Sequence, residues 1–557
     1  GSQFVHISTN RGGTCETISA DLTTNDTAKQ KQLESGGLTY DVTTAENHCT
    51  IITIAPSPIQ QGVIWVGTDD GNVQVTTNGG MTWTNVVRNM KGVPESTWVP
   101  QIQASTYAAG EAFVVFDNHR RNDWTPYVYR TKDFGKTWTR LVDDKDVWGY
   151  ALCMVQDPVE PKLMFVGTEF GLYASIDGGE SWTKWKHGFP TVSTMDMTIH
   201  PKEHDLVIGT FGRAVHVLDD IHPLREIVRR GTSVLDEPLH LFAIPDAVLS
   251  QMRGMVGGMF GPGDGEFNGE NRPYGARISF VINPPDTAKN KKDDKKKADA
   301  PKDSVTGSPD SVKMEVLRMD GELLRTLRVH VKKGINRTTW GLDRKVERMP
   351  SRPKPEPGAS EQGGWTVLPG TYKVRLTYGK HADSTTVTVK ADPRLPFTEQ
   401  EMIANVAFFD TIYQRVHIAT DAADRLRAAK KTTEQSAGIL KERSDSTAKK
   451  VKDLGTALQD SIKTLNEMID DREVQGIRSD PTLLESRLYS AMSYAGSSWY
   501  PPGESERTAL RHAMESLKKL ADAINTFFER DWLKYKDAVD AANINFFEPY
   551  APIKVGN

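Results

Sequence analysis

This 557-residue sequence has no long apolar run, few cysteines and no marked excess of charge of either sign. It contains no run of about 18 apolar residues, so no transmembrane helix is expected. The formal net charge of -4 gives no reason to expect nucleic acid as a partner. Because the chain is longer than one hydrophobic core supports, about two to four domains are expected.

The three cysteines, Cys15, Cys49 and Cys153, are too few for a disulfide scaffold and lack the spacing of metal ligands. They are expected to be small buried residues, with a Cys15–Cys49 bridge as an open alternative. Three further motifs are missing: a glycine-rich phosphate loop, a serine nucleophile elbow and a His-Glu metal motif. The sequence therefore predicts no metal site and no cofactor.

One eight-residue pattern is present in four copies that begin at Ser8, Thr76, Thr131 and Ser175. It reads hydroxyl, any residue, Asp or Asn, any residue, Gly, any residue, Ser or Thr, then Trp, and the first copy ends in Cys15 instead of Trp. The pattern predicts a tight β-hairpin turn in which the third residue bonds turn amides, Gly takes a positive φ and Trp packs onto the sheet. These structural positions are Asn10, Asn78, Asp133 and Asp177, with Trp83, Trp138 and Trp182.

An apolar run ending in Gly-Thr precedes two of these turns, at residues 63–68 and 163–168, and occurs again at 206–210. This spacing predicts about four short strands per unit, as in a propeller blade. The expected units are 49–90, 98–143 and 150–188, with a closing unit at 193–220. Because the first ten residues align with the second half of a unit, the chain is expected to begin in mid-blade. The ring would then be completed by other blades of the same precursor or by a partner chain.

The pattern changes twice after the repeats. Residues 223–272 are expected to be a Gly- and Met-rich connector, and residues 273–394 alternate at period two, as in an immunoglobulin-like β-sandwich, with a Lys/Asp-rich loop at 286–310. Residues 395–548 have helical periodicity that begins with a capping box, Thr398 with Glu401. The predicted fold is therefore multidomain, mainly β and then α: a partial β-propeller (1–222), a sandwich and a helical hairpin or bundle.

Four segments, together with the repeated turn, resemble a known family: residues 46–51, 63–72, 169–173 and 209–221. They are similar to bacterial Asp-box (BNR-repeat) β-propeller proteins, which are sortilin-like, exported and often labelled glycosyl hydrolases. The resemblance implies that the chain is the C-terminal portion of a longer protein of the periplasm, cell surface or extracellular space. The activity label of the family is an analogy from fold.

Candidate site residues are expected at the end of the sheets opposite the repeated turns. A glycosidase needs paired carboxylates and rings for sugar stacking. Asp70 and Glu169 are the proposed catalytic pair, with Glu46 as a substitute, although Asp in a Gly-bounded turn often serves the turn itself. The proposed binding residues are Trp98, Trp148, Tyr150, His119, Arg120 and Arg213. His48, Asp69, Asp117 and Arg121 are expected on the same face.

Two functions remain open from the sequence. The first is a binding or scaffold protein that engages a protein partner, such as an envelope protein, or a glycan. The second is a glycoside hydrolase of sialidase or xyloglucanase type. A sialidase needs three arginines and a Tyr–Glu nucleophile, and the sequence offers only Arg120, Arg121 and Arg213 as an arginine cluster. Because no complete catalytic set is visible, the binding function is favoured.

Overall fold

The computed structural model describes residues 2–31, 48–250, 272–284, 310–356, 359, 361–470 and 480–543. The chain divides into two compact units, Gly1–Glu237 and Pro238–Asn557. Glu46 and residues 251–271, 285–309 and 544–557 lie outside the described residues. Within the described part, no helix is both long and apolar enough to cross a bilayer.

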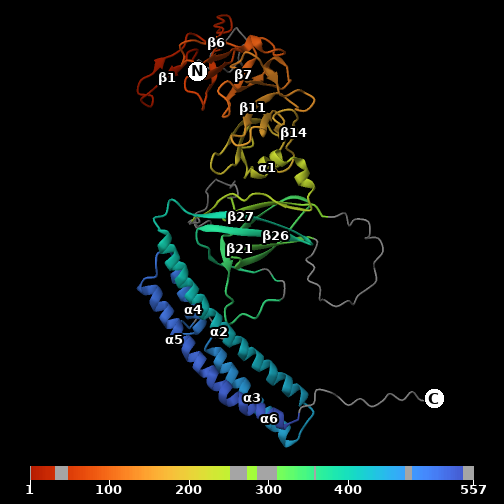
Figure 1. The fold of residues 1–557 in the computed structure, drawn as a ribbon, viewed down its shortest axis with the longest axis vertical. Coiled ribbons are helices and arrows are strands. Elements are labelled where there is room, and N and C mark those ends of the chain that lie inside the picture. Colours follow the sequence, from red (N-terminus) through yellow and green to blue (C-terminus); the bar gives the residue numbers. More distant parts are fainter. Residues whose placement is uncertain are drawn as a thin grey trace, which may run out of the picture. The chain divides into compact units, whose positions relative to one another are not determined.

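The first unit consists of antiparallel sheets that follow one another along the chain (Figure 1). After the two-stranded sheet β1–β2 come sheet I (β3–β6), sheet II (β7–β10), sheet III (β11–β14) and the three-stranded sheet IV (β15–β17). Each of sheets I to IV lies inside one of the four strand groups expected from the repeat. The strands are β1 (His6–Ile7), β2 (Glu16–Thr17), β3 (Ile51–Pro56), β4 (Ile64–Thr68), β5 (Val73–Thr76), β6 (Thr84–Asn85), β7 (Trp98–Ala104), β8 (Ala112–Asp117), β9 (Tyr127–Thr131), β10 (Thr139–Arg140), β11 (Ala151–Gln156), β12 (Met164–Thr168), β13 (Gly171–Ser175), β14 (Thr183–Lys184), β15 (Thr194–Ile199), β16 (Leu206–Thr210) and β17 (Val215–Leu218).

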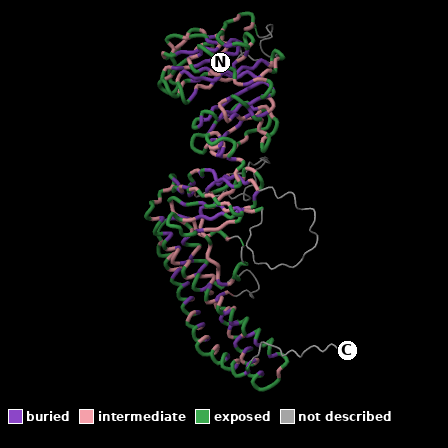
Figure 2. The backbone as a smooth tube through the Cα atoms, turned by 45° about the vertical axis from the view of Figure 1, so that its right-hand side comes forward, coloured by how far each residue is buried: buried purple, intermediate pink, exposed green. Residues whose placement is uncertain are grey.

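The first strand of each sheet lies beside the first strand of the next: β3 beside β7, β7 beside β11, and β11 beside β15. Apolar side chains fill the space between successive sheets, so each interface has its own core. Buried residues run through the sheets of this unit (Figure 2). Strand β11 is buried along its whole length, because a sheet packs on each of its faces. Its continuous apolar sequence reflects burial on both sides.

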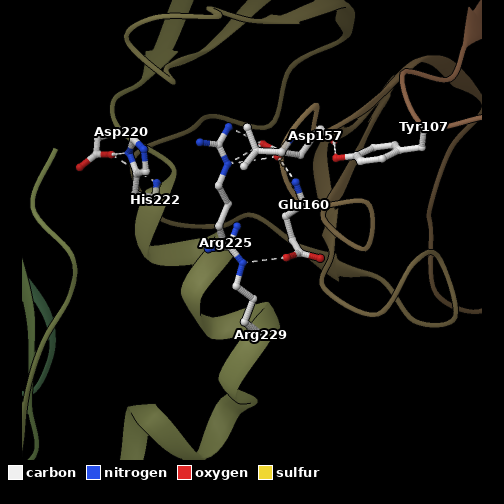
Figure 3. A network of polar contacts seen from close by, with 8 residues as sticks. Tyr107, Asp157, Glu160, Asp220, His222, Arg225 and Arg229 are labelled. Carbon is white, nitrogen blue, oxygen red and sulfur yellow. Dashed lines mark hydrogen bonds and ion pairs between the residues drawn. The ribbon is translucent and has the colours of Figure 1, made fainter. Parts of the chain in front are cut away.

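Helix α1 (His222–Arg230) follows β17, at the point where sheets I to III have a fourth strand. Leu224 and Val228 of this helix pack into the core between sheets III and IV. Arg225 is buried and forms a double hydrogen bond with the fully buried Asp157, with Nη2 2.8 Å from Oδ2 and Nε 3.1 Å from Oδ1 (Figure 3). Helix α1 is therefore tied to the turn between β11 and β12 by an ion pair out of contact with water.

Two weaker contacts surround this pair. Arg229, one turn further along α1, donates from Nε to Glu160 Oε2 over 3.0 Å and is more than half exposed (Figure 3). The Tyr107 hydroxyl donates to the backbone oxygen of Asp157 over 2.7 Å. Burial, followed by the charge of Asp157, raises the pKa of Tyr107 to about 12. The short 3-10 helices of this unit are η1 (Val87–Asn89), η2 (His119–Arg121) and η3 (Thr232–Asp236).

Two sheets share one core in the second unit, with strand orders β18-β20-β23 and β19-β27-β26-β21-β22. Strands β24 and β25 form a separate hairpin. Strands β18 and β19 lie in residues 223–250, which the sequence assigned to a connector, and they form because Leu239, Leu241 and Leu249 are buried in this core. The strands are β18 (Leu239–Leu241), β19 (Ala247–Leu249), β20 (Ala276–Ile282), β21 (Ser311–Arg318), β22 (Leu323–His330), β23 (Gly334–Trp340), β24 (Asp343–Lys345), β25 (Gly363–Thr366), β26 (Gly370–Tyr378) and β27 (His381–Ala391).

The helices that follow share a second core, built from one apolar face of each. The capping box predicted for the first of them is confirmed: Thr398 Oγ1 accepts from Glu401 N, and the Glu401 side chain accepts from Thr398 N. Trp365 of β25 stacks on Phe409 of this helix at 4.2 Å, which joins sheets and helices within the unit. The helices are α2 (Glu399–Ile439), α3 (Ser446–Glu467), α4 (Leu484–Ala495), α5 (Glu504–Thr526), the π-helical turn η4 (Phe527–Trp532) and α6 (Leu533–Ala541).

All three cysteines are free thiols. Cys49 and Cys153 are buried, as expected, but Cys15 is exposed at the end of its surface turn. Cys153 is a residue of β11, and its Sγ lies 3.5 Å from the backbone oxygen of Thr194 in β15. Burial raises the pKa of this thiol far above its usual range.

Candidate functional site

The four repeated turns use their polar groups within the turn itself. In the turn between β13 and β14, the Ser175 hydroxyl donates to Asp177 Oδ1 (2.7 Å) and Ser181 N donates to the same oxygen (3.0 Å). The same contacts recur around Asn10, Asn78 and Asp133. Hydrogen bonds from Ser181 and Ser175 outweigh partial burial and hold the pKa of Asp177 below its usual value. These carboxylates and amides therefore stabilise hairpins.

The tryptophan that ends each complete turn packs inward. Trp83 Nε1 donates to the Ile18 backbone oxygen (3.1 Å), and Trp182 Nε1 to that of Leu141 (2.9 Å), each in the preceding part of the chain. Trp138 Nε1 donates to Gly135 within its own turn (3.0 Å). Trp83 and Trp182 thus join their hairpins to the preceding part of the chain, whereas the Trp138 ring packs edge-on against Trp65 of β4.

The turns between second and third strands lie at the other end of the sheets, because antiparallel strands reverse direction at each turn. We call this end the loop face; it comprises residues 69–72, 118–126, 169–170 and 211–214 and the segments just before β3, β7, β11 and β15. One hydrogen bond repeats there: Glu169 N donates to Tyr150 O (3.2 Å) and Phe211 N to Ser193 O (2.9 Å). The loop face thus has a regular framework that positions its side chains.

Aromatic rings from sheets II and III meet on the loop face. His119 of η2 stacks on Tyr150 with centroids 4.4 Å apart, and Trp124 tilts against Tyr150 at 5.4 Å. Trp148 stacks on Phe170 at 4.5 Å, and it is 64% exposed, whereas Trp124 is 51% exposed. The group therefore presents two large exposed indole rings.

Two cations lie against rings of the same face. The Arg120 guanidinium is 4.2 Å from the Trp98 ring centroid, and Lys184 Nζ is 5.8 Å from that of Trp148. Cations at such distances are attracted by the ring quadrupole. Trp98, His119, Arg120, Trp148 and Tyr150, predicted from the sequence as binding residues, all have their contacts here. Arg213 is an exposed residue of the turn between β16 and β17.

The carboxylates beside these rings have hydrogen-bond partners within the protein. Asp117 is buried, with Oδ1 2.6 Å from His119 Nδ1 and Oδ2 3.3 Å from Arg120 Nη1. Glu169 Oε2 accepts from the hydroxyls of Tyr150 (2.7 Å) and Ser193 (2.8 Å). Burial, and then the hydrogen bond to Glu169, raise the pKa of Tyr150 well above its usual value.

The predicted catalytic pair is not brought together. Asp70, in sheet I, is buried and accepts from Thr24 N (2.6 Å), the Thr24 hydroxyl (2.7 Å) and the Thr68 hydroxyl (2.5 Å). Glu169 belongs to sheet III, with sheet II between them. Asp69 is also buried and accepts from Thr50 N (2.7 Å), and burial raises its pKa. Asp69 and Asp70 are thus engaged in fixing backbone segments.

Two residues of the site were not singled out from the sequence, Trp124 and Phe170. Each contributes a ring to a stack with a residue that was predicted, Tyr150 or Trp148. Trp124 follows a polar segment of the loop after β8, and an aromatic residue in such a loop is a usable signal. A concavity of about 560 Å³ beside the repeated turn of sheet III is lined by polar and aliphatic residues, among them Arg130, Arg140 and Asp143. The stacked aromatic rings therefore lie on the protein surface, outside that concavity.

Metal ligation finds no support in the residues described: they contain no group of three or more His, Cys, Asp or Glu side chains placed to hold an ion.

No protein-family model matches the sequence, and no curated protein matches it. Among solved structures, the GH74 xyloglucanase from Xanthomonas campestris is 13% identical, with a TM-score of 0.23 over 29% of this chain and 26% of that chain. An ancestral GH74 enzyme is 11% identical, with a TM-score of 0.27 over 69% of this chain and 43% of that chain. YCF48 bound to D1 peptide is 15% identical, with a TM-score of 0.21 over 30% of this chain and 64% of that chain. This chain covers less than two thirds of each, and likenesses this weak carry no argument about function.

Proposed function

We propose that this chain is a binding and scaffold module of an exported protein, and that its loop face holds a protein or glycan partner. The observation that carries the proposal is the pair of exposed rings, Trp124 and Trp148, flanked by Arg120 and Lys184. Trp and Arg are enriched among the residues that dominate binding interfaces. The neighbouring carboxylates, Asp117 and Glu169, are occupied by internal hydrogen bonds.

The finer family assignment is part of the same proposal. The repeated turn is an Asp-box of the BNR-repeat, sortilin-like family, and sheets I to IV form part of a β-propeller that other blades complete. The two sheets of the second unit form an immunoglobulin-like sandwich that, with the helices, supports assembly. The protein acts in the periplasm, at the cell surface or outside the cell. Four self-contained turns and the side-by-side first strands support this assignment.

A test of the binding function needs defined probes of both partner classes. A glycan array and a phage-displayed peptide library would be screened against the whole chain. We expect ligands from one class, and at least a tenfold loss of affinity on Trp124→Ala or Trp148→Ala, because each change removes an exposed ring. Met81→Ala is the matched control, since Met81 is exposed in a repeated turn. Ligands that bind equally well to both tryptophan variants, or no ligand of either class, would contradict the proposal.

One observation favours a second function, glycoside hydrolysis of sialidase type. Sialidases use a tyrosine nucleophile, and the Tyr150 hydroxyl lies 2.7 Å from Glu169 Oε2. Burial and the hydrogen bond to Glu169 raise the pKa of Tyr150, so attack by its oxygen would require Glu169 to accept the proton. Fluorogenic glycosides, including sialosides, would be tested with Tyr150→Phe, Glu169→Gln and Asp70→Asn. Turnover that Tyr150→Phe abolishes would replace the binding function with hydrolysis.

A further inference from the structure

Two glycines lie directly against a side chain from the first strand of the next sheet. A Cβ atom on Gly67 of β4 would lie 2.5 Å from Val99 Cγ1 of β7, and one on Gly167 of β12 would lie 2.6 Å from Thr194 Cγ2 of β15. Neither glycine has the positive φ that would itself demand glycine. Each therefore accommodates a β-branched side chain from the first strand of the following sheet.

Gly209 occupies the same position in β16, but none of the described residues places a side chain over it. It follows the apolar run of its strand and precedes Thr210, as Gly67 precedes Thr68 and Gly167 precedes Thr168. The nearest atom to its Cβ position is the backbone oxygen of Asp196, 3.6 Å away in its own sheet. Sheet IV thus contains the glycine that elsewhere permits a close approach, but within the described part of the chain no strand packs over it.

The side chains around Gly209 are exposed, unlike their counterparts in sheet III. Val215 pairs with Gly209, and Val217 pairs with Val207 on the same face; Val215 and Val217 are 62% and 52% exposed. In sheet III, Leu172 matches Val215 and is fully buried against sheet IV, and Ala174 matches Val217 and is half-buried there. We call this surface the open face of sheet IV. Its composition is that of a covered surface. It comprises Asp196, Thr198, Val207, Gly209, Val215 and Val217.

A polar contact also repeats between the first strands. Thr53 Oγ1 of β3 accepts a hydrogen bond from Ile102 N of β7 (3.2 Å). Gln101 Oε1 of β7 accepts one from Met154 N of β11 (2.6 Å). In both cases a side chain of one sheet receives a backbone N–H of the next sheet's first strand.

Asp196 supplies an acceptor at the same place in sheet IV. Thr53 pairs with Gly67 across β3 and β4, and Asp196 pairs with Gly209 across β15 and β16. The Asp196 side chain is exposed on the open face, and its Oδ1 accepts from Met197 N (2.8 Å). A carboxylate has capacity for several donors, so it can also accept the N–H of an incoming strand.

We propose that the open face of sheet IV is the docking surface for the first strand of a further β-sheet of the same repeat. This proposal rests on the propeller assignment made above. The incoming strand places a Val or Thr side chain over Gly209, covers Val215 and Val217, and donates a backbone N–H to Asp196. It carries no acidic side chain next to Asp196, because like charges repel at such an interface.

The first strands within this chain are not expected to supply that strand from a second copy. Strands β7, β11 and β15 already pack between or against neighbouring sheets. In β3 the residue at the matching position is Ile51, which is buried with Val5 and Leu22, and its N–H donates to Ser2 O (3.0 Å). The expected occupant is therefore the first strand of a sheet outside the residues described.

The test uses the whole chain and a synthetic peptide of residues 96–105, labelled with fluorescein. This peptide reproduces β7, whose Val99 covers Gly67 and whose Ile102 N–H reaches Thr53, and it has no charged side chain. We expect saturable binding by fluorescence anisotropy and at least a tenfold loss with Gly209→Val or Val217→Lys. Gly209→Val has room for its side chain in the chain alone, and near-ultraviolet circular dichroism would verify its fold.

Controls separate this proposal from the function of the loop face. Met81→Lys adds the same charge at an exposed repeated turn and is expected to bind the peptide normally, and a scrambled peptide is expected not to bind. Trp124→Ala and Trp148→Ala are expected to leave peptide binding unchanged, whatever they do to loop-face ligands. Absence of saturable binding, or equal binding to the Gly209→Val variant, overturns the docking proposal and leaves the loop-face proposal unaffected.

Discussion

Sheets III and IV are built from the same repeat but differ in what surrounds them. Sheet III has four strands, a complete repeated turn and a neighbouring sheet on each face. Sheet IV has three strands and one open face, and helix α1 follows where the fourth strand stands elsewhere. The repeat therefore encodes the strands, whereas burial of a strand's side chains depends on the neighbour that packs on it.

Helix α1 compensates for the missing hairpin of sheet IV. In sheet III the repeated turn delivers Trp182 to the core shared with sheet II. In sheet IV, Leu224 and Val228 of α1 enter the core shared with sheet III, and the Arg225–Asp157 pair holds the helix there. In sheet IV, a buried ion pair thus holds α1 in place, whereas in sheet III the corresponding position is occupied by a hairpin turn.

The largest expected loss of stability comes from removing the cation of this ion pair. Arg225→Met leaves the buried Asp157 carboxylate without its cation and is expected to cost about 3–5 kcal/mol of unfolding free energy. Arg229→Met is the matched control one helical turn later, where the pair is partly exposed, and its expected cost is at most about 1 kcal/mol. Urea denaturation and hydrogen exchange of α1 measure both. Equal losses in the two variants would contradict the assigned role of the buried pair.

A smaller effect compares the two glycines directly. Gly167→Ala places a methyl group 2.6 Å from Cys153 Sγ and Thr194 Cγ2, and such overpacking is expected to cost about 1–3 kcal/mol. Gly209→Ala meets nothing closer than 3.6 Å and is expected to be neutral or to stabilise by up to about 1 kcal/mol, because it removes backbone freedom from the unfolded chain. Thermal unfolding of the two variants measures both effects. A loss of stability in Gly209→Ala comparable with that in Gly167→Ala would mean that sheet IV is not open there.

The turn of sheet III offers a pH-dependent change. The folded-state pKa of Asp177 lies below its ordinary value of 3.8, so its contribution to stability is present above that value and is lost as the pH falls through the folded pKa. Asp177→Asn makes the turn like that of Asn78 and is expected to weaken the pH dependence below pH 4. Acid denaturation curves test this, with Glu180→Gln, an exposed neighbour, as control. Unchanged curves for Asp177→Asn would contradict the role given to the carboxylate.

The smallest effect is expected on the open face. Val215→Thr keeps the β-branched shape and changes an exposed side chain, so the unfolding free energy of the chain alone is expected to change by less than about 0.5 kcal/mol. Its counterpart Leu172 is fully buried, and Leu172→Ala is expected to cost at least about 2 kcal/mol. A large loss for Val215→Thr would show that something already covers the face.

The parts of the fold that depend on local signals could be predicted from the sequence. The repeated turns and the capping box of α2 join residues two to four positions apart, so their chemistry is visible in the sequence. Helix α1 could not be predicted, because what holds it, the contact of Arg225 with Asp157, spans 68 residues. Strands β18 and β19 were missed for the same reason, since they form by pairing with β20 and β27.

The site was predictable in position but not in detail. Turn periodicity indicated that Trp98, Trp148 and Tyr150 share one end of the sheets. The stacks that Trp124 and Phe170 make could not be deduced, because they depend on how loops meet in space. A structural role of Asp70 within its turn was foreseen as an alternative, but its contact with Thr24, 46 residues away, could not be deduced. The roles proposed for the site residues stay predictions.

The buried thiol of Cys153 lies in the interface between sheets III and IV, here called the seam. A thiol reagent can therefore be used to measure how often this seam opens. Its raised pKa and its position against Thr194 keep it in the unreactive, protonated form while the seam is closed. A thiol reagent can modify it only during transient separation of β11 from β15, so its labelling rate reports how often this seam opens. A strand docked on the open face of sheet IV is expected to lower the labelling rate of Cys153. The reactivity of a buried thiol would then report binding at the protein surface.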